Sequence, residues 1–243
     1  MSADIVYLHI KRAIDSNKEC FLCTLEDELE RKYIDTYLDE LVMDPASREK
    51  IIESRGFCNH HSYKMLIAAG KPRSLDGHGL ALVIKSVVEK LVQDFCKQEK
   101  LSQNHFLRML PNETKCPACV HLSHFVKMYT QTVAELLSSS HEEFLKLFEG
   151  SKGLCVPHFV ALLSETERIS PGRGRATIET VIEVEEKSLR RLDSELAEYV
   201  RMQSYEFSEK DREEVEGAVL RSIEKIAGRR GLKLTNLIER REE

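Results

Sequence analysis

Residues 20–61 read CFLCTLEDELERKYIDTYLDELVMDPASREKIIESRGFCNHH, and the two short motifs at the ends of this stretch decide the fold prediction. It opens with a Cys-x-x-Cys motif, Cys20 and Cys23, and closes with a Cys-x-x-His motif, Cys58 and His61. A tight turn that enters a helix brings residues i and i+3 to the same side, so each motif can direct two side chains at one metal ion. The stretch therefore predicts metal binding on a helical scaffold.

The chain contains the same pair of motifs a second time. The second Cys-x-x-Cys motif, Cys116 and Cys119, lies 96 positions after the first, and the second Cys-x-x-His motif, Cys155 and His158, lies 97 positions after its counterpart. The flanking residues repeat as well, since RGFC at 55–58 corresponds to KGLC at 152–155. Repetition at a constant interval indicates an internal duplication.

Apolar residues recur at helical spacing between the motifs of each copy. They are Leu25, Leu29, Tyr33, Tyr37 and Leu41 in the first copy, and Leu122, Phe125, Val126, Tyr129, Val133 and Leu136 in the second. A short helix is expected to follow, from Asp44-Pro45 in the first copy and from near Ser140 in the second, because Asp caps helices and Pro suits their first turn. Gly56 and Gly153 stand where the chain needs a residue that accepts positive φ.

A longer apolar stripe follows each Cys-x-x-His motif and predicts helices over 79–96 and 177–200. Sustained period-two alternation, the signature of strands, is absent from the sequence. The fold class is therefore predicted as all-α, a duplicated helical repeat in which each half is a metal-clamped helical hairpin plus a long core helix. The expected domains are a first metal-binding repeat at 1–100, a second at 101–205, and a charged C-terminal helix and tail at 206–243.

Composition limits the classes of partner. The chain has 243 residues, 42% of them hydrophobic, which is enough for a packed core, and its formal net charge of −5 gives no strong overall attraction to nucleic acid or anionic membranes. The apolar runs are too short to span a bilayer, and the charged beginning lacks the layout of a signal peptide. We expect a cytoplasmic protein, in which clustered cysteines serve as metal ligands or redox thiols rather than disulfides.

Each copy offers a complete set of four metal ligands. We expect Cys20, Cys23, Cys58 and His61 to form one site and Cys116, Cys119, Cys155 and His158 to form the other. Three thiolates and one imidazole in tetrahedral geometry suit zinc, so two zinc ions per chain are predicted, with iron in the same ligands or an Fe–S cluster as alternatives. Closed four-ligand sites are typically structural.

Other candidates carry weaker signals. His60 could replace His61, but the second copy has Pro157 before His158, so the shared spacing favours His61. His124, on the helix after Cys119, is a further candidate ligand, although an exposed or core-edge role is more common for such a residue. Cys96 has no counterpart in the other copy, and a buried inert thiol on an apolar helix is its usual role.

The stretch from Cys20 to His61, followed by the GLALVI helix, resembles an uncharacterised bacterial and archaeal domain of unknown function. Members have a Cys-Pro-Leu-Cys-like opening, a Met-Asp-Pro segment, Gly-Phe-Cys-x-x-His and a Gly-Leu-Ala-Leu helix. The likeness covers most of 5–96 and, through the repeat, much of 105–200. This chain has Phe21 where the family has proline, which leaves the ligands intact. The resemblance implies a helical fold with cysteine-histidine sites and brings no activity.

Two classes of function fit these features. The first is a non-enzymatic zinc module that presents helical surfaces to a protein or nucleic acid, for which the basic runs 171–175 and 228–233 offer phosphate contacts. The second is a thiol-based redox sensor or oxidoreductase that uses the Cys-x-x-Cys motifs. The sequence contains no Ser-His-Asp pattern, no phosphate-binding glycine loop and no HExxH motif that would indicate an enzyme. Oligomeric state is not encoded in any of these motifs.

Overall fold

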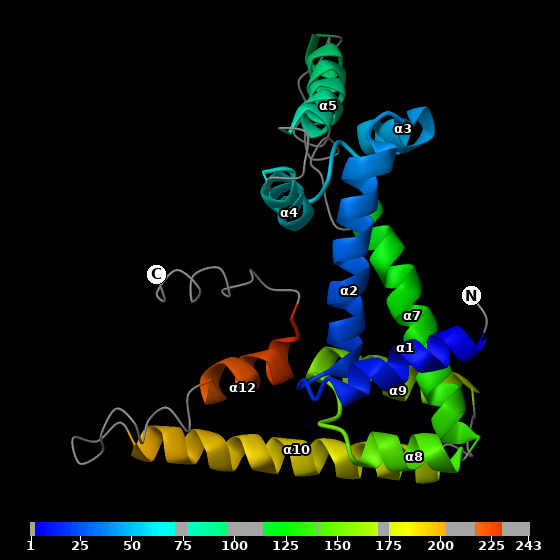
Figure 1. Cartoon of the computed structure of the whole chain (residues 1–243), viewed down its shortest axis with the longest axis vertical. Coiled ribbons are helices and arrows are strands. Elements are labelled where there is room, and N and C mark those ends of the chain that lie inside the picture. The colour runs from blue at the N-terminus through cyan, green and yellow to red at the C-terminus, as the bar shows by residue number, and fades with distance from the viewer. Residues whose placement is uncertain are drawn as a thin grey trace. The chain divides into compact units, whose positions relative to one another are not determined.

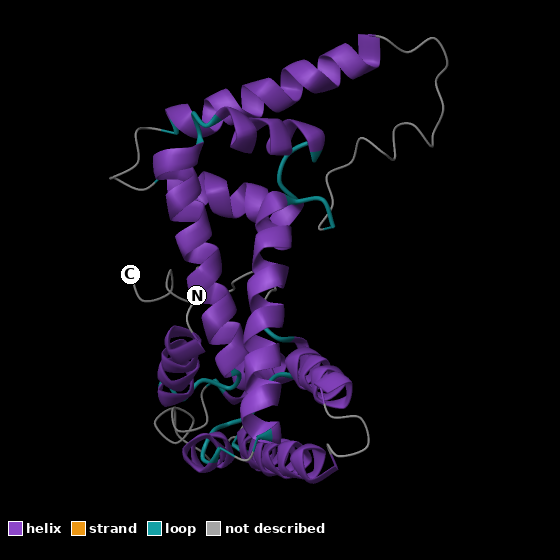
Figure 2. Cartoon of the chain, turned by 90° about the vertical axis from the view of Figure 1, so that its right-hand side faces the viewer, coloured by secondary structure: helices purple, strands orange, loops and turns teal. Residues whose placement is uncertain are grey.

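A computed structural model describes residues 3–70, 77–96, 114–139, 141–169, 175–202 and 217–229. Within these ranges every regular element is a helix, as Figure 2 shows, and this confirms the all-α prediction. The helices, labelled in Figure 1, are α1 (Ala3–Asp15), α2 (Phe21–Thr36), the π-helical turn η1 (Tyr37–Leu41), α3 (Pro45–Glu53), α4 (Asn59–Ala69), α5 (His78–Cys96), α7 (Pro117–Ser138), α8 (Glu142–Glu149), α9 (Val156–Ile169), α10 (Arg175–Arg201) and α12 (Ala218–Ala227).

The chain forms two compact units. The first consists of Met1–Asp27 and Val126–Glu243, and the second of Glu28–Phe125. The boundaries fall inside α2 and α7, so each of these helices contributes one end to each unit. The repeats at 1–100 and 101–205 stay a prediction about the sequence, and each compact unit draws residues from both of them.

The second unit has a core of aromatic and branched side chains. Tyr37, Ile51, Phe57, Met65 and Val83 are all buried there, from η1 through α5. The rings of Tyr37 and Phe57 meet edge to face at 5.2 Å between centroids. Apolar burial of this extent is the main stabilising term for a helical unit, since short helices are marginal by themselves.

The first unit packs α1, α8 and α10 around the beginning of α2. Phe21, at the first position of α2, meets Phe148 of α8 edge to face at 6.2 Å. Tyr129 of α7 is buried, and its hydroxyl lies in hydrogen-bonding distance, 2.9 Å, of His9 Nδ1 on α1. A buried phenol of this kind is stable when its oxygen has a partner.

The predicted helix boundaries hold at several positions. Asp44 caps α3, since its carboxylate accepts a hydrogen bond from the Ser47 backbone at 2.7 Å, and Pro45 opens the first turn. In the second copy His141 provides the cap of α8 by accepting from the Phe144 backbone N–H at 3.3 Å. The long helices predicted at 79–96 and 177–200 appear as α5 and α10.

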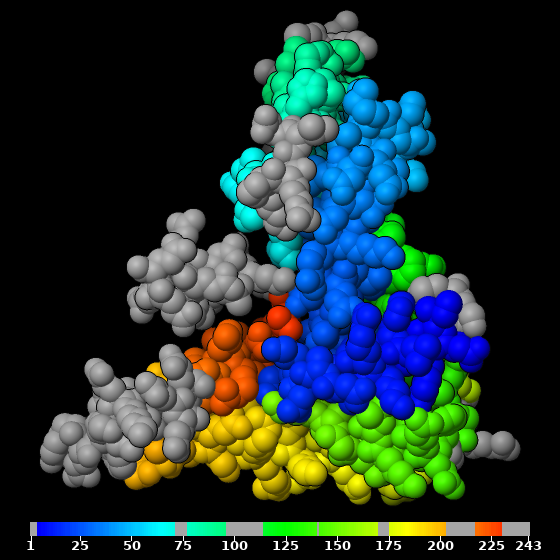
Figure 3. Space-filling view, viewed as in Figure 1, coloured from blue at the N-terminus to red at the C-terminus, as the bar shows by residue number. Residues whose placement is uncertain are grey.

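Within the first unit, helix α12 packs against α9 and α10, and Figure 3 shows it lying along α10. The sequence predicts a charged helix from about residue 208, of which the structure describes 217–229. Among the described residues, the helices are all too short or too polar to cross a membrane.

Candidate metal centres

All four motifs stand at the beginning of a helix. Cys20 directly precedes α2, Cys58 is the N-cap of α4, Cys116 directly precedes α7, and Cys155 directly precedes α9. The second ligand of each motif follows three residues later, one turn into the helix. The helices therefore begin inside the motifs, slightly earlier than the apolar pattern predicts. Free N–H groups at these ends favour negative charge, such as that of thiolates.

The structure brings the eight predicted ligands into two groups of four, but with exchanged partners. Cys20 and Cys23 lie with Cys155 and His158, and Cys58 and His61 lie with Cys116 and Cys119. Each group thus combines the Cys-x-x-Cys motif of one copy with the Cys-x-x-His motif of the other. The prediction that each copy completes its own site is wrong, and so is the single-copy clamped hairpin that rests on it.

Helix lengths give the physical reason for the exchange. Helix α2 has 16 residues and η1 continues it for 5 more, while α3, which follows, has only 9. At about 1.5 Å per residue, the first two elements advance the chain by about 30 Å and α3 by only about 14 Å. With only the short segments 42–44 and 54–57 besides α3, the chain in this structure does not bring Cys58 back to the beginning of α2.

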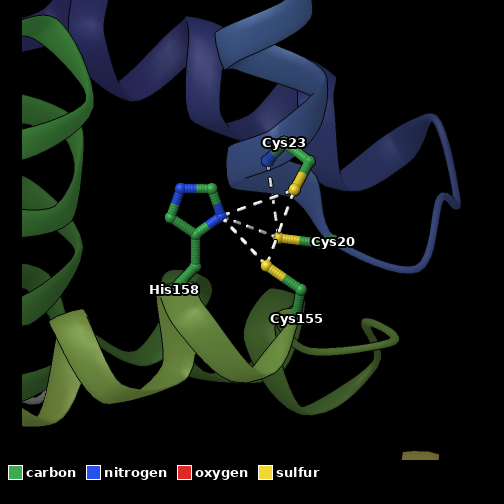
Figure 4. A group of neighbouring side chains, drawn as sticks. All are labelled: Cys20, Cys23, Cys155 and His158. Carbon is green, nitrogen blue, oxygen red and sulfur yellow. Dashed lines mark hydrogen bonds between the residues drawn. The ribbon is translucent and has the colours of Figure 1, made fainter. Parts of the chain in front are cut away.

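The first group lies entirely in the first unit (Figure 4). His158 presents Nδ1 to all three sulfurs, at 3.4 Å from Cys20, 3.5 Å from Cys23 and 3.2 Å from Cys155. The sulfurs of Cys23 and Cys155 are 3.6 Å apart. In Figure 4 the pair from the beginning of α9 faces the pair from the beginning of α2, with the four donor atoms converging.

The second group repeats this geometry in the second unit. His61 Nδ1 lies 3.2 Å from the sulfur of Cys58, 3.6 Å from that of Cys116 and 3.3 Å from that of Cys119. The sulfurs of Cys58 and Cys119 are 3.7 Å apart. Both groups therefore use the same imidazole nitrogen and the same arrangement of sulfurs.

These distances fit a tetrahedral zinc ion. With Zn–S near 2.3 Å and Zn–N near 2.0–2.1 Å, the edges of such a tetrahedron are about 3.8 Å between sulfurs and about 3.5 Å between sulfur and nitrogen. The observed sulfur–sulfur distances of 3.6 and 3.7 Å and sulfur–nitrogen distances of 3.2–3.6 Å are close to these values. Both donor sets thus match zinc in chemistry and in size.

Charge also favours a cation within the first group. Hydrogen bonds to Cys155 and Cys20, together with burial, raise the pKa of Cys23 far above its usual value. Hydrogen bonds from Cys20 and Cys23 outweigh burial and lower the pKa of Cys155. A divalent ion at this place would let three thiolates share so small a buried volume.

Two buried carboxylates of α2 stand behind the histidines, and the sequence analysis did not identify them. Glu26 Oε2 lies 3.8 Å from His158 Nε2, and Glu30 Oε1 lies 3.2 Å from His61 Nε2, although the angle of the second contact is outside hydrogen-bond geometry. A carboxylate on the far nitrogen orients a histidine ligand and sets its tautomer. The available signal was two acids, four residues apart, each directly after an apolar-stripe residue of α2.

Three basic side chains lie close to the carboxylate of Glu30. His60 Nε2 lies 2.7 Å from one carboxylate oxygen, and Lys64 pairs with the other. Burial raises the pKa of Glu30, but the close contacts with His60, His61 and the Lys64 cation outweigh it and hold the pKa well below its usual range. Glu30, His60 and His61 are close enough to share an ion, yet Lys64 already supplies positive charge there. We therefore assign His60 to the surroundings of the second group.

Ion pairs from α10 and α12 hold the two loops of the first group. Glu19, which precedes Cys20 and is 3% exposed, pairs with Arg191 of α10 at 2.5 Å. Glu185 of α10 accepts from the Leu154 backbone N–H, next to Cys155, and pairs with Lys225 of α12. Lys225 is fully buried and also donates to the Lys152 carbonyl at 2.9 Å.

Two glycines of the first unit allow close approach to this group. Gly153 has φ +73°, as predicted, and a Cβ there would collide with the Glu185 carboxylate. Gly228, just beyond α12, has φ +76°, and a Cβ there would lie 3.3 Å from the Cys155 sulfur. In the other copy Gly56 has φ +103°, also as predicted. The C-terminal helix thus contributes to the surroundings of the site.

The remaining candidates lie outside both groups of four. His124 is exposed and contacts Phe125, with ring centroids 5.5 Å apart. His121 packs against Tyr33 at 4.8 Å between centroids. The side chain of Cys96 lies outside the described residues, so its assignment as a buried thiol stays a prediction.

Comparison with known proteins agrees with the resemblance seen in the sequence. Residues 1–232 match DUF6062, a family of unknown function. The chain belongs to this family. It is also 25% identical, over 168 residues, to an uncharacterised 23.9 kDa protein in the xynA 3′ region of Caldicellulosiruptor sp. (strain Rt8B.4), covering 66% of this chain and 74% of that protein. No solved structure matches this DUF6062 chain.

Proposed function

We propose that this DUF6062 chain is a zinc-binding helical protein in which two zinc ions per chain act as structural cross-links. The observation that carries the proposal is the pair of closed groups, Cys20–Cys23–Cys155–His158 and Cys58–His61–Cys116–Cys119. Each group offers four donors at tetrahedral distances, which leaves no ligand position for a substrate. Each ion would join motifs from the two predicted repeats.

Burial favours a structural role over thiol redox chemistry. Cys20, Cys116 and Cys155 are at most 1% exposed, so these thiols are closed to reactants from solvent. In the second group burial also raises the pKa of Cys116 and of Cys119, whereas in the first group the pKa of Cys155 is lowered although its side chain is buried. Reactive thiols are usually accessible and have lowered pKa values. Metal binding then stabilises the fold in the manner of structural zinc sites, where ligand binding and folding are coupled.

The cross-linked scaffold is proposed to serve as an interaction module for another protein. Ile84, Val88 and Val92 are 42–55% exposed and recur every four residues along α5, so they form one apolar stripe on the helix surface. Such stripes are typical of surfaces that bind a partner helix. For nucleic acid the structural support is weaker, because Arg229, in the basic run 228–233, pairs with Asp27 at 3.1 Å and with Glu224 at 3.4 Å.

The metal proposal is tested on protein purified without a metal-binding tag. Elemental analysis should give about two zinc ions per chain, and removal of zinc by a strong chelator should lower the unfolding temperature reversibly. Iron with visible absorption would favour a cluster. Oxidant-dependent release of zinc under mild conditions, with recovery of zinc binding on reduction, would favour the redox alternative.

A further inference from the structure

A pocket of about 620 Å³ opens in the second unit between the end of α2, α3 and the beginning of α7. This volume lies within the range of small-molecule binding sites in proteins. The pocket wall includes Pro117, the residue after the ligand Cys116, so the pocket adjoins the second metal group without sharing its four donors.

One side of the pocket is aromatic. Tyr33, Tyr37 and His121 line it, and the Tyr33 ring lies 4.8 Å from that of His121 and 6.1 Å from that of Tyr37, between centroids. Leu41 and Val120 extend the apolar lining. Flat rings stack or pack edge to face on such a surface, so it favours a planar, unsaturated ligand over a flexible chain.

The polar groups of the pocket wall favour a ligand that carries a negatively charged hydrogen-bond acceptor. Tyr37 is 1% exposed, and its hydroxyl has no hydrogen-bond partner among the described residues. Burial raises the pKa of Tyr37 to about 12, so the hydroxyl keeps its proton and can donate it in a hydrogen bond. Two cationic side chains, Lys50 and Lys115, and one carboxylate, that of Glu53, also line the pocket. A buried donor without an acceptor is destabilising, and a ligand oxygen would satisfy it.

We propose that this pocket binds a small aromatic carboxylate, with its ring against Tyr33 and His121 and its carboxylate accepting from the Tyr37 hydroxyl near the two lysines. This inference is independent of the zinc proposal, since it depends on a pocket wall and not on the metal ligands.

The test uses the full metal-loaded chain and isothermal titration with naphthalene-2-carboxylate. Two comparison probes, naphthalene-2-carboxamide and hexanoate, separate the contributions of charge and ring. We expect the carboxylate to bind, and both comparison probes to bind at least about tenfold more weakly because each lacks one of the two recognised features.

Variants locate the binding. Tyr37→Phe keeps the ring and removes the hydroxyl, and it should weaken binding of naphthalene-2-carboxylate about tenfold. The zinc content should stay that of the parent chain, and the unfolding temperature should be equal or higher because an unpaired buried hydroxyl is removed. Lys50→Met should weaken it several-fold. Lys85→Met, on the exposed surface of α5 and outside the pocket, is the matched control and should bind as the parent does.

Absence of binding at millimolar probe would overturn the proposal, as would equal binding of the carboxamide or of hexanoate. Unchanged affinity in Tyr37→Phe would overturn the assigned orientation. If Tyr37→Phe unfolded the chain, Lys50→Met and chemical-shift changes at Val120 and His121 in the parent chain would still decide the location, with shifts confined to other regions counting against it.

Discussion

Cys23 and Cys155 are 132 residues apart in the sequence, and their sulfur atoms lie 3.6 Å from each other. A metal ion at this place would close a loop that contains the whole second unit, Glu28–Phe125. Cross-links that close long loops remove much conformational entropy from the unfolded chain. Two such links, as proposed, would make the stability of the chain depend on metal.

Metal removal should loosen the beginnings of four helices before the long helices. The first turns of α2, α4, α7 and α9 carry every proposed ligand, whereas α5 and α10 carry none. With a strong chelator, hydrogen exchange should speed up first in residues 20–27, 58–62, 116–121 and 155–160, and later in 79–96 and 177–200, because folding and metal binding are coupled at the motifs. Unaltered protection at all four helix beginnings after the metal has left would refute the structural role.

Glu30→Gln should weaken metal binding at the second group only. Loss of the carboxylate behind His61 removes the charge that orients the imidazole, and such outer partners are typically worth about 10–100-fold in metal affinity. Competition with a chromophoric chelator measures the two affinities. Asp35→Asn, an exposed residue on the same helix, is the control, and equal loss in both variants would mean that Glu30 acts only through general charge.

Lys225→Met should destabilise the first unit strongly. The lysine side chain is 1% exposed, and its removal leaves the buried carboxylate of Glu185, 8% exposed, without its cation. Breaking a buried pair costs about 3–5 kcal/mol in free energy of unfolding. Urea denaturation measures this. The double variant Lys225→Met with Glu185→Gln should recover part of the loss, whereas Lys187→Met, exposed on α10, should change little.

Gly153→Ala should lower stability more than Gly150→Ala. Gly153 has φ +73° and faces Glu185, so a methyl group adds both backbone strain and a collision. Gly150 has φ −80°, a conformation that alanine adopts readily. We expect a loss of at least about 1 kcal/mol at position 153 and a smaller effect at 150, from thermal unfolding of both variants. Comparable midpoints would show that the turn tolerates a side chain.

The sequence predicts the local structure well because the signals are local. Helical spacing of apolar residues predicted α5 and α10, the Asp44-Pro45 pair predicted the beginning of α3, and glycine at 56 and 153 predicted positive φ. Each of these features depends on residues within a few positions of one another. Family membership was predicted from the same motifs and is confirmed.

The pairing of the motifs could not be predicted, because both pairings give the same donors. Each Cys-x-x-Cys motif, combined with either Cys-x-x-His motif, gives three sulfurs and one nitrogen. The donor atoms are therefore the same for both pairings and favour neither. The pairing depends on how the length of α2 with η1 compares with that of α3, because these lengths set where the chain places Cys58 in space. The carboxylates of Glu26 and Glu30 were missed for a similar reason, since their partners come from other helices.

Zinc stoichiometry in two double variants tests the exchanged pairing most directly. Cys23→Ser with Cys155→Ser removes two ligands from one observed group, and Cys23→Ser with Cys58→Ser removes one ligand from each. Elemental analysis after equilibration with a moderate chelator should find about one tightly bound zinc per chain in the first variant and almost none in the second, since loss of one ligand from a closed site weakens it severely. One zinc retained by the Cys23–Cys58 variant and none by the Cys23–Cys155 variant would contradict the exchange and restore the pairing within each repeat.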